Sequence, residues 1–290
     1  MATNTPFGQR LGLVLEGGAM RGIYTAGVLD VFLEAGIMPD VVVGVSAGAL
    51  HGCSYVAGQK GRSIRYYRKY RSDKHFMGLY SLLTTGDVVG TKFCYEDIPL
   101  RLDPFNEAAF EKAPVDFYVT VTNVRTGKPE YILCDELKVG SKMDVIRAGA
   151  SMPLCSKMVE WNGNLYLDGG VSDSIPYAKM KDFGCRKSIV VLTPPAGYLK
   201  QPAAMAPFEA MYRKYPAFVE AMRGRDQMYN TEVCAVEQAA KQGDVFLIRP
   251  SKLLHVGRME HDIEVLNAQY ELGRQDARNQ MDAMREWIER

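Results

Sequence analysis

The sequence predicts an α/β fold, a three-layer α/β/α arrangement around a mainly parallel central sheet. Two observations carry this prediction. Short, uniformly apolar runs are typical of strands buried on both faces, and the chain has such runs at 11–15 and 41–43. Each run leads through a glycine-containing turn into a segment typical of a helix, at 21–35 and 46–57. Strand–helix–strand units of this kind pair their strands in parallel through right-handed crossovers.

The first helical segment, residues 21–35, is predicted to be amphipathic. Its apolar residues recur at helical spacing and so fall on one face, which would pack on the sheet. They are Ile23, Ala26, Val28, Leu29 and Phe32. Gly36 and Pro39 follow, and both are typical of a helix end.

Further strands are expected later in the chain, each a short run rich in apolar or β-branched residues. They lie at 115–122, 130–133, 165–167, 188–193 and 245–248. Residues 126–129 (TGKP) separate the first two runs and predict a hairpin-like connection.

The last third of the chain has a different composition. Residues 194–230 are rich in Pro, Ala, Met and aromatic residues, which indicates irregular backbone followed by helix. Apolar residues at helical spacing then predict a long helix over 263–288. We therefore predict a core domain at 8–195 and a helix-rich extension at 196–290, with one strand at 245–249, packed on the same domain.

Composition excludes several classes of protein. The 290 residues carry a net charge of +1, so no overall field draws the chain to nucleic acid or to an anionic membrane. The longest mainly apolar stretch, 41–50, is far shorter than the ~20 residues that span a bilayer. The first ten residues lack the apolar core of a secretory signal, and six scattered cysteines indicate free thiols. We expect a cytoplasmic protein with at most peripheral membrane contact; a tethered periplasmic form is the alternative.

A candidate nucleophile lies between the second strand and the second helix. Gly44-Val45-Ser46-Ala47-Gly48 has the G-x-S-x-G pattern, in which a sharp strand-to-helix turn exposes the serine hydroxyl. The helix N-terminus also places unpaired N–H groups beside it. A small-residue turn without chemistry is the alternative, and the strand and helix around the motif favour the nucleophile.

A glycine-rich loop follows the first strand. Residues 16–22 (EGGAMRG) can aim backbone N–H groups at a negative oxygen, as a tetrahedral intermediate requires. A dinucleotide-binding loop is the alternative, but Ala19 replaces the middle glycine of that fingerprint. A third motif, Asp168-Gly169-Gly170, follows the short strand at 165–167. It could supply the base that a serine nucleophile needs, or it could be an ordinary Asp-Gly turn.

Together, in this order and spacing, the three motifs resemble the signatures of the patatin-like phospholipase family. Those signatures are a DGGGx[KR]G oxyanion loop, a GxSxG turn and a DG[GA] with the catalytic aspartate, which here read EGGAMRG, GVSAG and DGG. Residues 148–153 are similar to the family's stretch ahead of the aspartate, and the resemblance covers about 11–193.

The resemblance implies a lipid acyl hydrolase of phospholipase A or esterase type, without cofactor or metal. Ser46 would be the nucleophile that forms an acyl-enzyme, and Asp168 would accept its proton. The oxyanion hole would consist of Gly17, Gly18 and Ala19. Supporting positions in the motifs would be Arg21, Gly22, Gly44, Gly48, Gly169 and Gly170.

Two departures from the family pattern affect the predicted oxyanion loop. Glu16 stands where the family has Asp, and Ala19 where it has a third glycine. The Cβ of Ala19 restricts its backbone angles, so we expect the hole to rest mainly on Gly17 and Gly18, with modest activity.

Three other functions remain open at this point. A Ser-Asp-His triad could use His255 or His261, although the early position of the nucleophile in the chain favours the dyad. The scaffold could also be a lipid-binding module without catalysis, or an acyltransferase. The four histidines lack ligand spacing, so no metal site is predicted.

We expect a lipid or fatty-acyl ester as the binding partner, with transient contact to a membrane surface, and no nucleic acid. Residues 65–71 interleave cations with tyrosines, which suits either a membrane interface or, the favoured interpretation, a helix that packs its tyrosines inward. Methionines and aromatic residues over 208–228 could cover an acyl-chain pocket or belong to the core.

Overall fold

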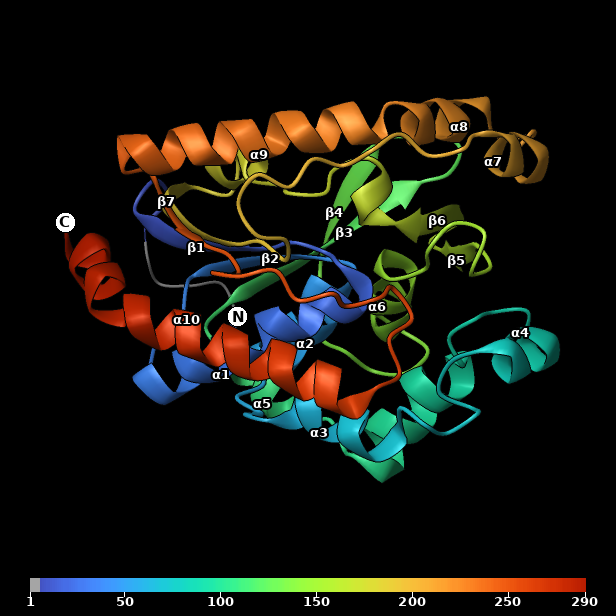
Figure 1. Ribbon diagram of the computed structural model, residues 1–290, viewed down its shortest axis with the longest axis horizontal. Helices are drawn as coiled ribbons and strands as arrows, with labels where there is room; N and C mark the ends of the chain where they lie inside the picture. The colour runs from blue at the N-terminus through green and yellow to red at the C-terminus, as the bar shows by residue number, and fades with distance from the viewer. Residues whose placement is uncertain (1–5) are drawn as a thin grey trace.

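The computed structural model describes residues 6–290 and has one mixed sheet at its centre, with helices on both faces (Figure 1). The order of strands across the sheet is β5-β6-β3-β2-β1-β7-β8, and β4 also pairs with β3. The strands are β1 (Arg10–Leu15), β2 (Val41–Val45), β3 (Asp116–Asn123), β4 (Pro129–Leu133), β5 (Val159–Trp161), β6 (Asn164–Asp168), β7 (Cys185–Val191) and β8 (Val245–Ile248). β1, β2, β3, β7 and β8 are mutually parallel, as the sequence predicts.

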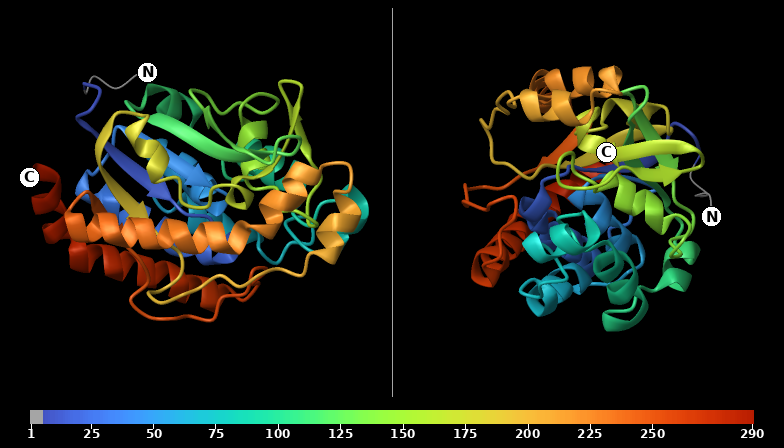
Figure 2. Two further views of the ribbon diagram at one scale, coloured as in Figure 1. Left: turned by 90° about the horizontal axis from the view of Figure 1, so that it is seen from above. Right: turned by 90° about the vertical axis from the view of Figure 1, so that its right-hand side faces the viewer.

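Helices form the two outer layers, so the predicted three-layer α/β/α fold is confirmed (Figures 1 and 2). One face of the sheet is covered by α1 (Ile23–Ala35), α2 (Ala47–Val56), α6 (Met143–Gly149) and α10 (Ile263–Glu289), with α3 (Arg62–Tyr70) and α5 (Glu107–Lys112) outside them. The other face carries α9 (Arg225–Gln242), preceded by α7 (Ala206–Met211) and α8 (Pro216–Arg223). The short helix α4 (Leu79–Thr85) projects at the right of Figure 1.

The central strands are uniformly apolar because each of their faces meets a helical layer. Leu13 and Leu15 of β1 pack with α1 and α2, whereas Val14 between them packs with α9. All five residues of β2 are buried. A strand with water on one face would need alternating polar residues, so the continuous runs in the sequence follow from this double burial.

The helix predicted at 21–35 is present as α1, but it is not amphipathic. Residues 23–32 of α1 are all buried, because α10 covers the face of α1 that points away from the sheet. The two helices cross closely at glycines: a Cβ on Gly27 would lie 2.1 Å from the carbonyl oxygen of Tyr270, and one on Gly273 equally close to that of Tyr24. The second apolar face of α1 is therefore the docking site of a helix that lies some 240 residues later.

The chain after residue 195 adds to both layers and to the sheet. β8 extends the sheet by parallel pairing with β7, α9 lies on one face and α10 on the other (Figure 1). The loop of 251–262 between β8 and α10 runs along the carboxyl ends of the parallel strands. The C-terminal region thus reaches the edge of the sheet where α/β proteins place their sites.

Asp168 reaches this edge by a route that the sequence did not predict. β6 is antiparallel to β3, so its carboxyl end would ordinarily point to the opposite edge of the sheet. On β3, however, it pairs only with residues 121–123, which extend β3 beyond the end of β2. Its other partner is β5. Asp168 pairs with Val121, one residue past the partner of Val45, and so lies level with Ser46.

Candidate active site

Ser46 lies at the tight turn between β2 and α2, as the G-x-S-x-G motif predicts. Its φ of 52° is in the left-handed region, where a residue with a Cβ is strained. The turn fits only small neighbours, since a Cβ on Gly48 would lie 2.3 Å from the carbonyl oxygen of Leu15 and one on Gly44 2.5 Å from the Cα of Ala49. The strained turn fixes the direction of the serine side chain.

The Ser46 hydroxyl donates a hydrogen bond of 2.6 Å to Oδ2 of Asp168. The second oxygen, Oδ1, accepts one of 2.8 Å from the backbone N–H of Gly170. Both side chains are nearly buried, with Ser46 8% and Asp168 5% exposed. The two motifs, 122 residues apart in the chain, therefore meet as one polar pair.

Burial raises the pKa of Asp168 above its ordinary value. The hydrogen bond from Ser46 and the positive charge of Arg225 oppose this shift because both stabilise the carboxylate. A raised pKa makes the carboxylate a stronger base toward a hydroxyl than an exposed aspartate would be.

Backbone packing holds the turn that carries Asp168. A Cβ on Gly169 would lie 2.2 Å from the carbonyl oxygen of Thr120, so this position accepts only glycine. The hydroxyl of Thr122 donates a hydrogen bond of 2.8 Å to the carbonyl oxygen of Asp168. Contacts with β3 therefore fix the position of the turn that carries the Asp168 carboxylate.

The glycine-rich loop lies directly against the nucleophile. A Cβ on Gly17 would lie 2.8 Å from Cβ of Ser46, and one on Gly18 2.5 Å from Oγ1 of Thr193. Within residues 6–290, the N–H groups of Gly17 and Gly18 donate no hydrogen bond to the protein. Both residues line one pocket together with Ser46.

Ala19 adopts a positive φ of 48°, which glycine would accept without strain.

Glu16, at the start of the same loop, is buried. The Oε2 atom of Glu16 accepts hydrogen bonds from the N–H of Thr193 at 2.6 Å and from the hydroxyl of Thr193 at 3.2 Å. Glu16 thus joins the end of β1 to the end of β7 below the loop. Arg21 points its guanidinium over the ring of Tyr198, 5.4 Å from its centroid. Gly22 packs against Cβ of Ala47.

The histidines do not contact the Ser46–Asp168 pair. His255 and His261 are exposed on the loop before α10, and neither lines a pocket at Ser46. His51 is buried on α2, where burial lowers its pKa to about 4 and keeps the ring neutral. The geometry gives the His255 or His261 triad no support.

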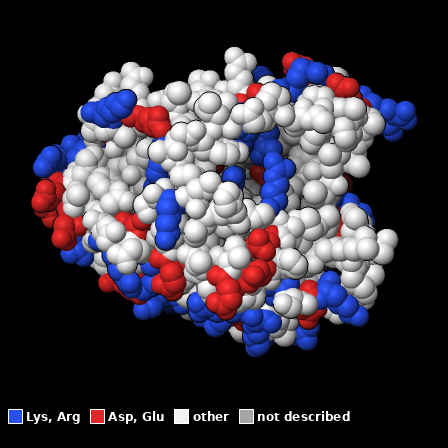
Figure 3. Space-filling model, viewed as in Figure 1, with Lys and Arg blue, Asp and Glu red and all other residues white. Residues whose placement is uncertain are grey.

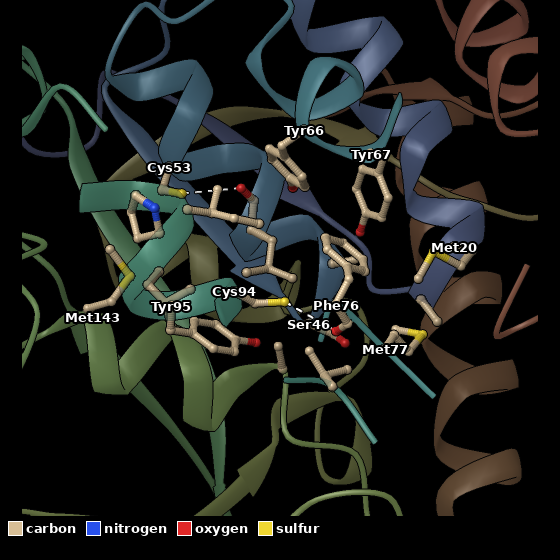
Figure 4. Close-up of a pocket in the computed structure, with 18 of the residues that line it drawn as sticks. Met20, Ser46, Cys53, Tyr66, Tyr67, Phe76, Met77, Cys94, Tyr95 and Met143 are labelled. Atoms are coloured by element: carbon tan, nitrogen blue, oxygen red, sulfur yellow. Dashed lines mark hydrogen bonds between the residues drawn. The ribbon is translucent and has the colours of Figure 1, made fainter. Parts of the chain in front are cut away.

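An apolar pocket opens on one side of Ser46 (Figure 4). Ser46 lies at one side of it, and Cys53 and Tyr66 lie toward the opposite side (Figure 4). Other residues that line it include Met20, Tyr67, Phe76, Tyr95 and Met143. The tyrosines of α3 therefore point inward, as the favoured interpretation of 65–71 has it, and two of them form a pocket wall.

A second pocket opens on the other side of Ser46, and this one is polar. It contains Ser46 and Asp168 together with four basic side chains, those of Arg21, Lys200, Arg225 and Arg258. Lys and Arg side chains border a hollow right of centre in Figure 3. Lys200, Arg225 and Arg258 could not be predicted from the sequence, since each is an isolated cation outside any motif. Residues 208–228 contribute Phe208 and Met222 to this polar pocket and not to the apolar one.

Residues 6–290 contain neither a cluster of metal ligands nor a membrane-spanning helix. No group of three or more His, Cys, Asp or Glu side chains is placed to hold a metal ion. No helix in this range is long and apolar enough to cross a bilayer. The six cysteines are free thiols.

Comparison with known proteins identifies the family. The model of the patatin-like phospholipases matches residues 13–180, more than half of the chain. The chain belongs to the patatin-like phospholipase family. This membership supports lipid acyl hydrolase activity, and the fold and the order of the three motifs agree with it. A model of a domain of unknown function (DUF6363) matches residues 215–289.

Relatives of this patatin-like protein differ in how much of their length it covers. It is 29% identical over 276 residues to the uncharacterized protein YjjU of Escherichia coli K12, covering 91% of this chain and 75% of that one. Lysophospholipases named nte1 from Aspergillus terreus and NTE1 from Saccharomyces cerevisiae are each 30% identical, over 61% and 63% of this chain but only 11% of their own length. Among solved structures, VipD from Legionella pneumophila aligns with a TM-score of 0.48 and 13% identity, over 96% of this chain and 67% of that one.

Proposed function

We propose that this patatin-like protein is a serine carboxylic-ester hydrolase that cleaves lipid or fatty-acyl esters through a Ser46–Asp168 dyad. The 2.6 Å hydrogen bond from the Ser46 hydroxyl to the Asp168 carboxylate carries the proposal. Nucleophilic catalysis by serine requires a base within hydrogen-bond reach of the hydroxyl, and Asp168 is the group that meets this condition.

The reaction would proceed in two halves. Ser46 Oγ attacks the ester carbonyl while Asp168 accepts the hydroxyl proton, and the carbonyl oxygen becomes an oxyanion. When the intermediate collapses, Asp168 returns the proton to the leaving alcohol and an acyl-serine remains. Water then attacks the acyl-serine while Asp168 accepts a proton from it. When this second intermediate collapses, Asp168 returns the proton to Ser46 Oγ and the fatty acid leaves.

The loop at Gly17 and Gly18 would stabilise the oxyanion in both halves. Its two N–H groups are unpaired within the described chain. Gly17 packs against Ser46, and Gly17 and Gly18 line one pocket together with Ser46. One donor of this kind is worth roughly 3 kcal/mol in related hydrolases. Ala19 shares the loop, and its strained φ of 48° presents a third N–H at the cost of about 1 kcal/mol.

The test is hydrolysis of p-nitrophenyl esters by purified variants. Ser46→Ala and Asp168→Asn should each lower kcat by about 10³-fold or more, because the dyad members act as a unit. Ser251→Ala, on an exposed serine that lines neither pocket, is the matched control and should keep full activity. His255→Ala and His261→Ala should also keep it. Retained turnover in Ser46→Ala would refute the dyad.

Labelling with a fluorophosphonate separates the enzyme from a lipid-binding module without catalysis. Only an activated serine reacts, so labelling should occur in the unmodified protein and be lost in Ser46→Ala. Adding glycerol as a competing acceptor separates a hydrolase from an acyltransferase. We expect free fatty acid as the main product.

We also propose transient contact with a membrane surface through α4. Leu79 and Leu83 on this helix are 70% and 77% exposed. Phe76 and Met77, just before α4, line the apolar pocket, so a lipid that meets α4 lies near that pocket. Leu83→Ser should reduce binding to phosphatidylcholine vesicles while hydrolysis of a short soluble ester stays unchanged. Equal vesicle binding by both proteins would exclude α4 as the contact.

A further inference from the structure

The polar pocket beside Ser46 has more positive than negative charge. Its cations come from four separate segments: the glycine-rich loop (Arg21), the chain after β7 (Lys200), the start of α9 (Arg225) and the loop before α10 (Arg258). Two carboxylates, Glu16 and Asp168, face them. Four cations against two anions leave an excess of positive charge in a concave, partly desolvated space, where electrostatic interactions are stronger than in water.

None of the four basic side chains forms a close ion pair within the described chain, although Glu16 and Asp168 lie in the same pocket. Across residues 6–290, ion pairs form at many places, for example between Arg65 and Asp103, but no carboxylate lies within ion-pair distance of these four. Arg225 donates through Nε to the carbonyl oxygen of Gly170 at 2.6 Å, which fixes its guanidinium at the wall of the pocket.

Aromatic rings orient two of the cations. The ammonium of Lys200 lies 4.0 Å from the centroid of the Tyr229 ring, and Arg21 lies over Tyr198. Burial, together with the charge of Arg225, lowers the pKa of Lys200 to about 7. Cations held this close repel one another, and a bound anion would remove that repulsion. The repulsion between the cations raises the free energy of the protein without a ligand, and a bound anion would lower it.

The position of the pocket relates it to the substrate. Ser46 lines both pockets, so an ester whose acyl chain lies in the apolar pocket must direct its alcohol portion into the polar one. Resting on the proposed hydrolase function, we propose that Lys200, Arg225 and Arg258 form a subsite for a phosphate on the alcohol portion. The substrate class that fits is an acylglycerol phosphate with a net negative head, in preference to a neutral acylglycerol or a zwitterionic choline ester.

A purely catalytic role is the competing explanation for these charges. Arg225 stabilises the ionised form of Asp168, and that effect would serve every ester alike. The two explanations differ in selectivity. A phosphate subsite changes the ratio of turnover between charged and neutral esters of the same acyl chain, whereas tuning of Asp168 leaves that ratio constant.

The experiment compares kcat/KM for 1-acylglycerol 3-phosphate and for 1-monoacylglycerol of the same chain. Arg258→Gln, on the exposed loop before α10, should lower the phosphate-to-neutral ratio about tenfold, and Lys200→Gln with Arg258→Gln about a hundredfold. Lys252→Gln, an exposed lysine on the same loop outside the pocket, is the matched control and should leave the ratio unchanged. Parallel losses on both esters would overturn the proposal.

Binding without turnover provides the second arm. Glycerol 3-phosphate should bind the Ser46→Ala protein in calorimetry, and it should inhibit hydrolysis of p-nitrophenyl butyrate by the unmodified protein. Adding Arg258→Gln to each of these proteins should weaken the binding and the inhibition at least tenfold. Inorganic phosphate at the same ionic strength separates a lipid head from the free ion. If inorganic phosphate binds as tightly while the ester ratio shows no preference for phosphate, a substrate subsite is refuted. If neither ester is cleaved by the unmodified protein, the hydrolase function itself fails.

Discussion

The two pockets that meet at Ser46 come from different parts of the chain. The apolar pocket is built by residues between 19 and 152, all within the part that matches the family model. The polar pocket takes three of its four cations from residues beyond 195. Under the proposed function, the family core provides the serine and the space for the acyl chain, and the C-terminal region selects the alcohol portion.

Their chemistry differs for a physical reason. An apolar wall gains free energy from any hydrocarbon in proportion to the area buried, so it selects length and shape weakly. A cluster of unpaired cations discriminates more sharply, because a neutral ligand leaves desolvated charges without partners. The polar side is therefore where we expect substrate specificity to reside.

The largest effect is expected from separating the C-terminal region from the core. Gly273→Ala places a Cβ 2.1 Å from the Tyr24 carbonyl oxygen and must push α10 away from α1. We expect a loss of roughly 3 kcal/mol in the free energy of unfolding, measured by urea denaturation. Gly224→Ala, where the nearest atom is 3.8 Å away, should change it by less than about 0.5 kcal/mol. An unchanged midpoint in Gly273→Ala would show that α10 is not integral to the fold.

Filling the apolar pocket should shorten the preferred acyl chain. Cys53 lies on the side of the pocket away from Ser46, so Cys53→Phe occupies space for the far end of a chain (Figure 4). Excluding two methylenes at about 0.8 kcal/mol each lowers kcat/KM for long esters about 15-fold, with a much smaller loss on butyrate. Cys234→Phe, on an exposed cysteine of α9, should leave the chain-length profile unchanged. Equal losses on all esters would indicate a folding defect.

The pH profile reports on Asp168, the proposed base, which lines the polar pocket. Burial raises the pKa of Asp168 above 3.8, and only the ionised carboxylate accepts a proton, so kcat/KM is full above that pKa and falls as the pH drops through it. The acid limb for a neutral p-nitrophenyl ester should therefore lie above pH 3.8. Arg225→Gln removes a charge that favours the carboxylate and should move the limb to higher pH.

The control for that shift is Arg223→Gln, an exposed arginine paired with Glu209. It should leave the acid limb in place. An acid limb that stays at the same pH in Arg225→Gln would mean that the charge of Arg225 does not affect the pKa of Asp168.

The smallest effect is expected at Ala19, which borders both pockets. Ala19→Gly relieves the positive φ, worth about 1 kcal/mol, but the more flexible unfolded chain offsets most of this gain. We expect a change in kcat below threefold and a nearly constant melting temperature. Ala19→Val, with a β-branched residue at the same φ, should lower kcat more than tenfold. A large gain in Ala19→Gly would show that the alanine limits the oxyanion hole.

Local pattern was sufficient for much of the fold. The apolar runs and turn glycines predict β1, α1, β2 and α2, and the residues 126–129 predict the hairpin between β3 and β4. The helix at 21–35 was predicted, but its burial on all sides was not. No pattern within that segment indicates that α10 packs on its outer face. The apolar residues on the outer face also recur at helical spacing, so the pattern does not distinguish a helix buried on one face from a helix buried on all faces.

The sequence by itself determined the three motifs on which the proposed chemistry rests: a serine on a tight turn, a glycine-rich loop and an aspartate followed by glycines. Each depends on residues adjacent in the chain. Only the tertiary structure decided that antiparallel β6 delivers Asp168 to the same edge as Ser46, because this follows from where β6 pairs along β3. It also decided that isolated cations such as Lys200 and Arg258 line one pocket. Electrostatic attraction depends on the distance between charges in space, and the positions of these cations along the chain do not indicate that they lie close together.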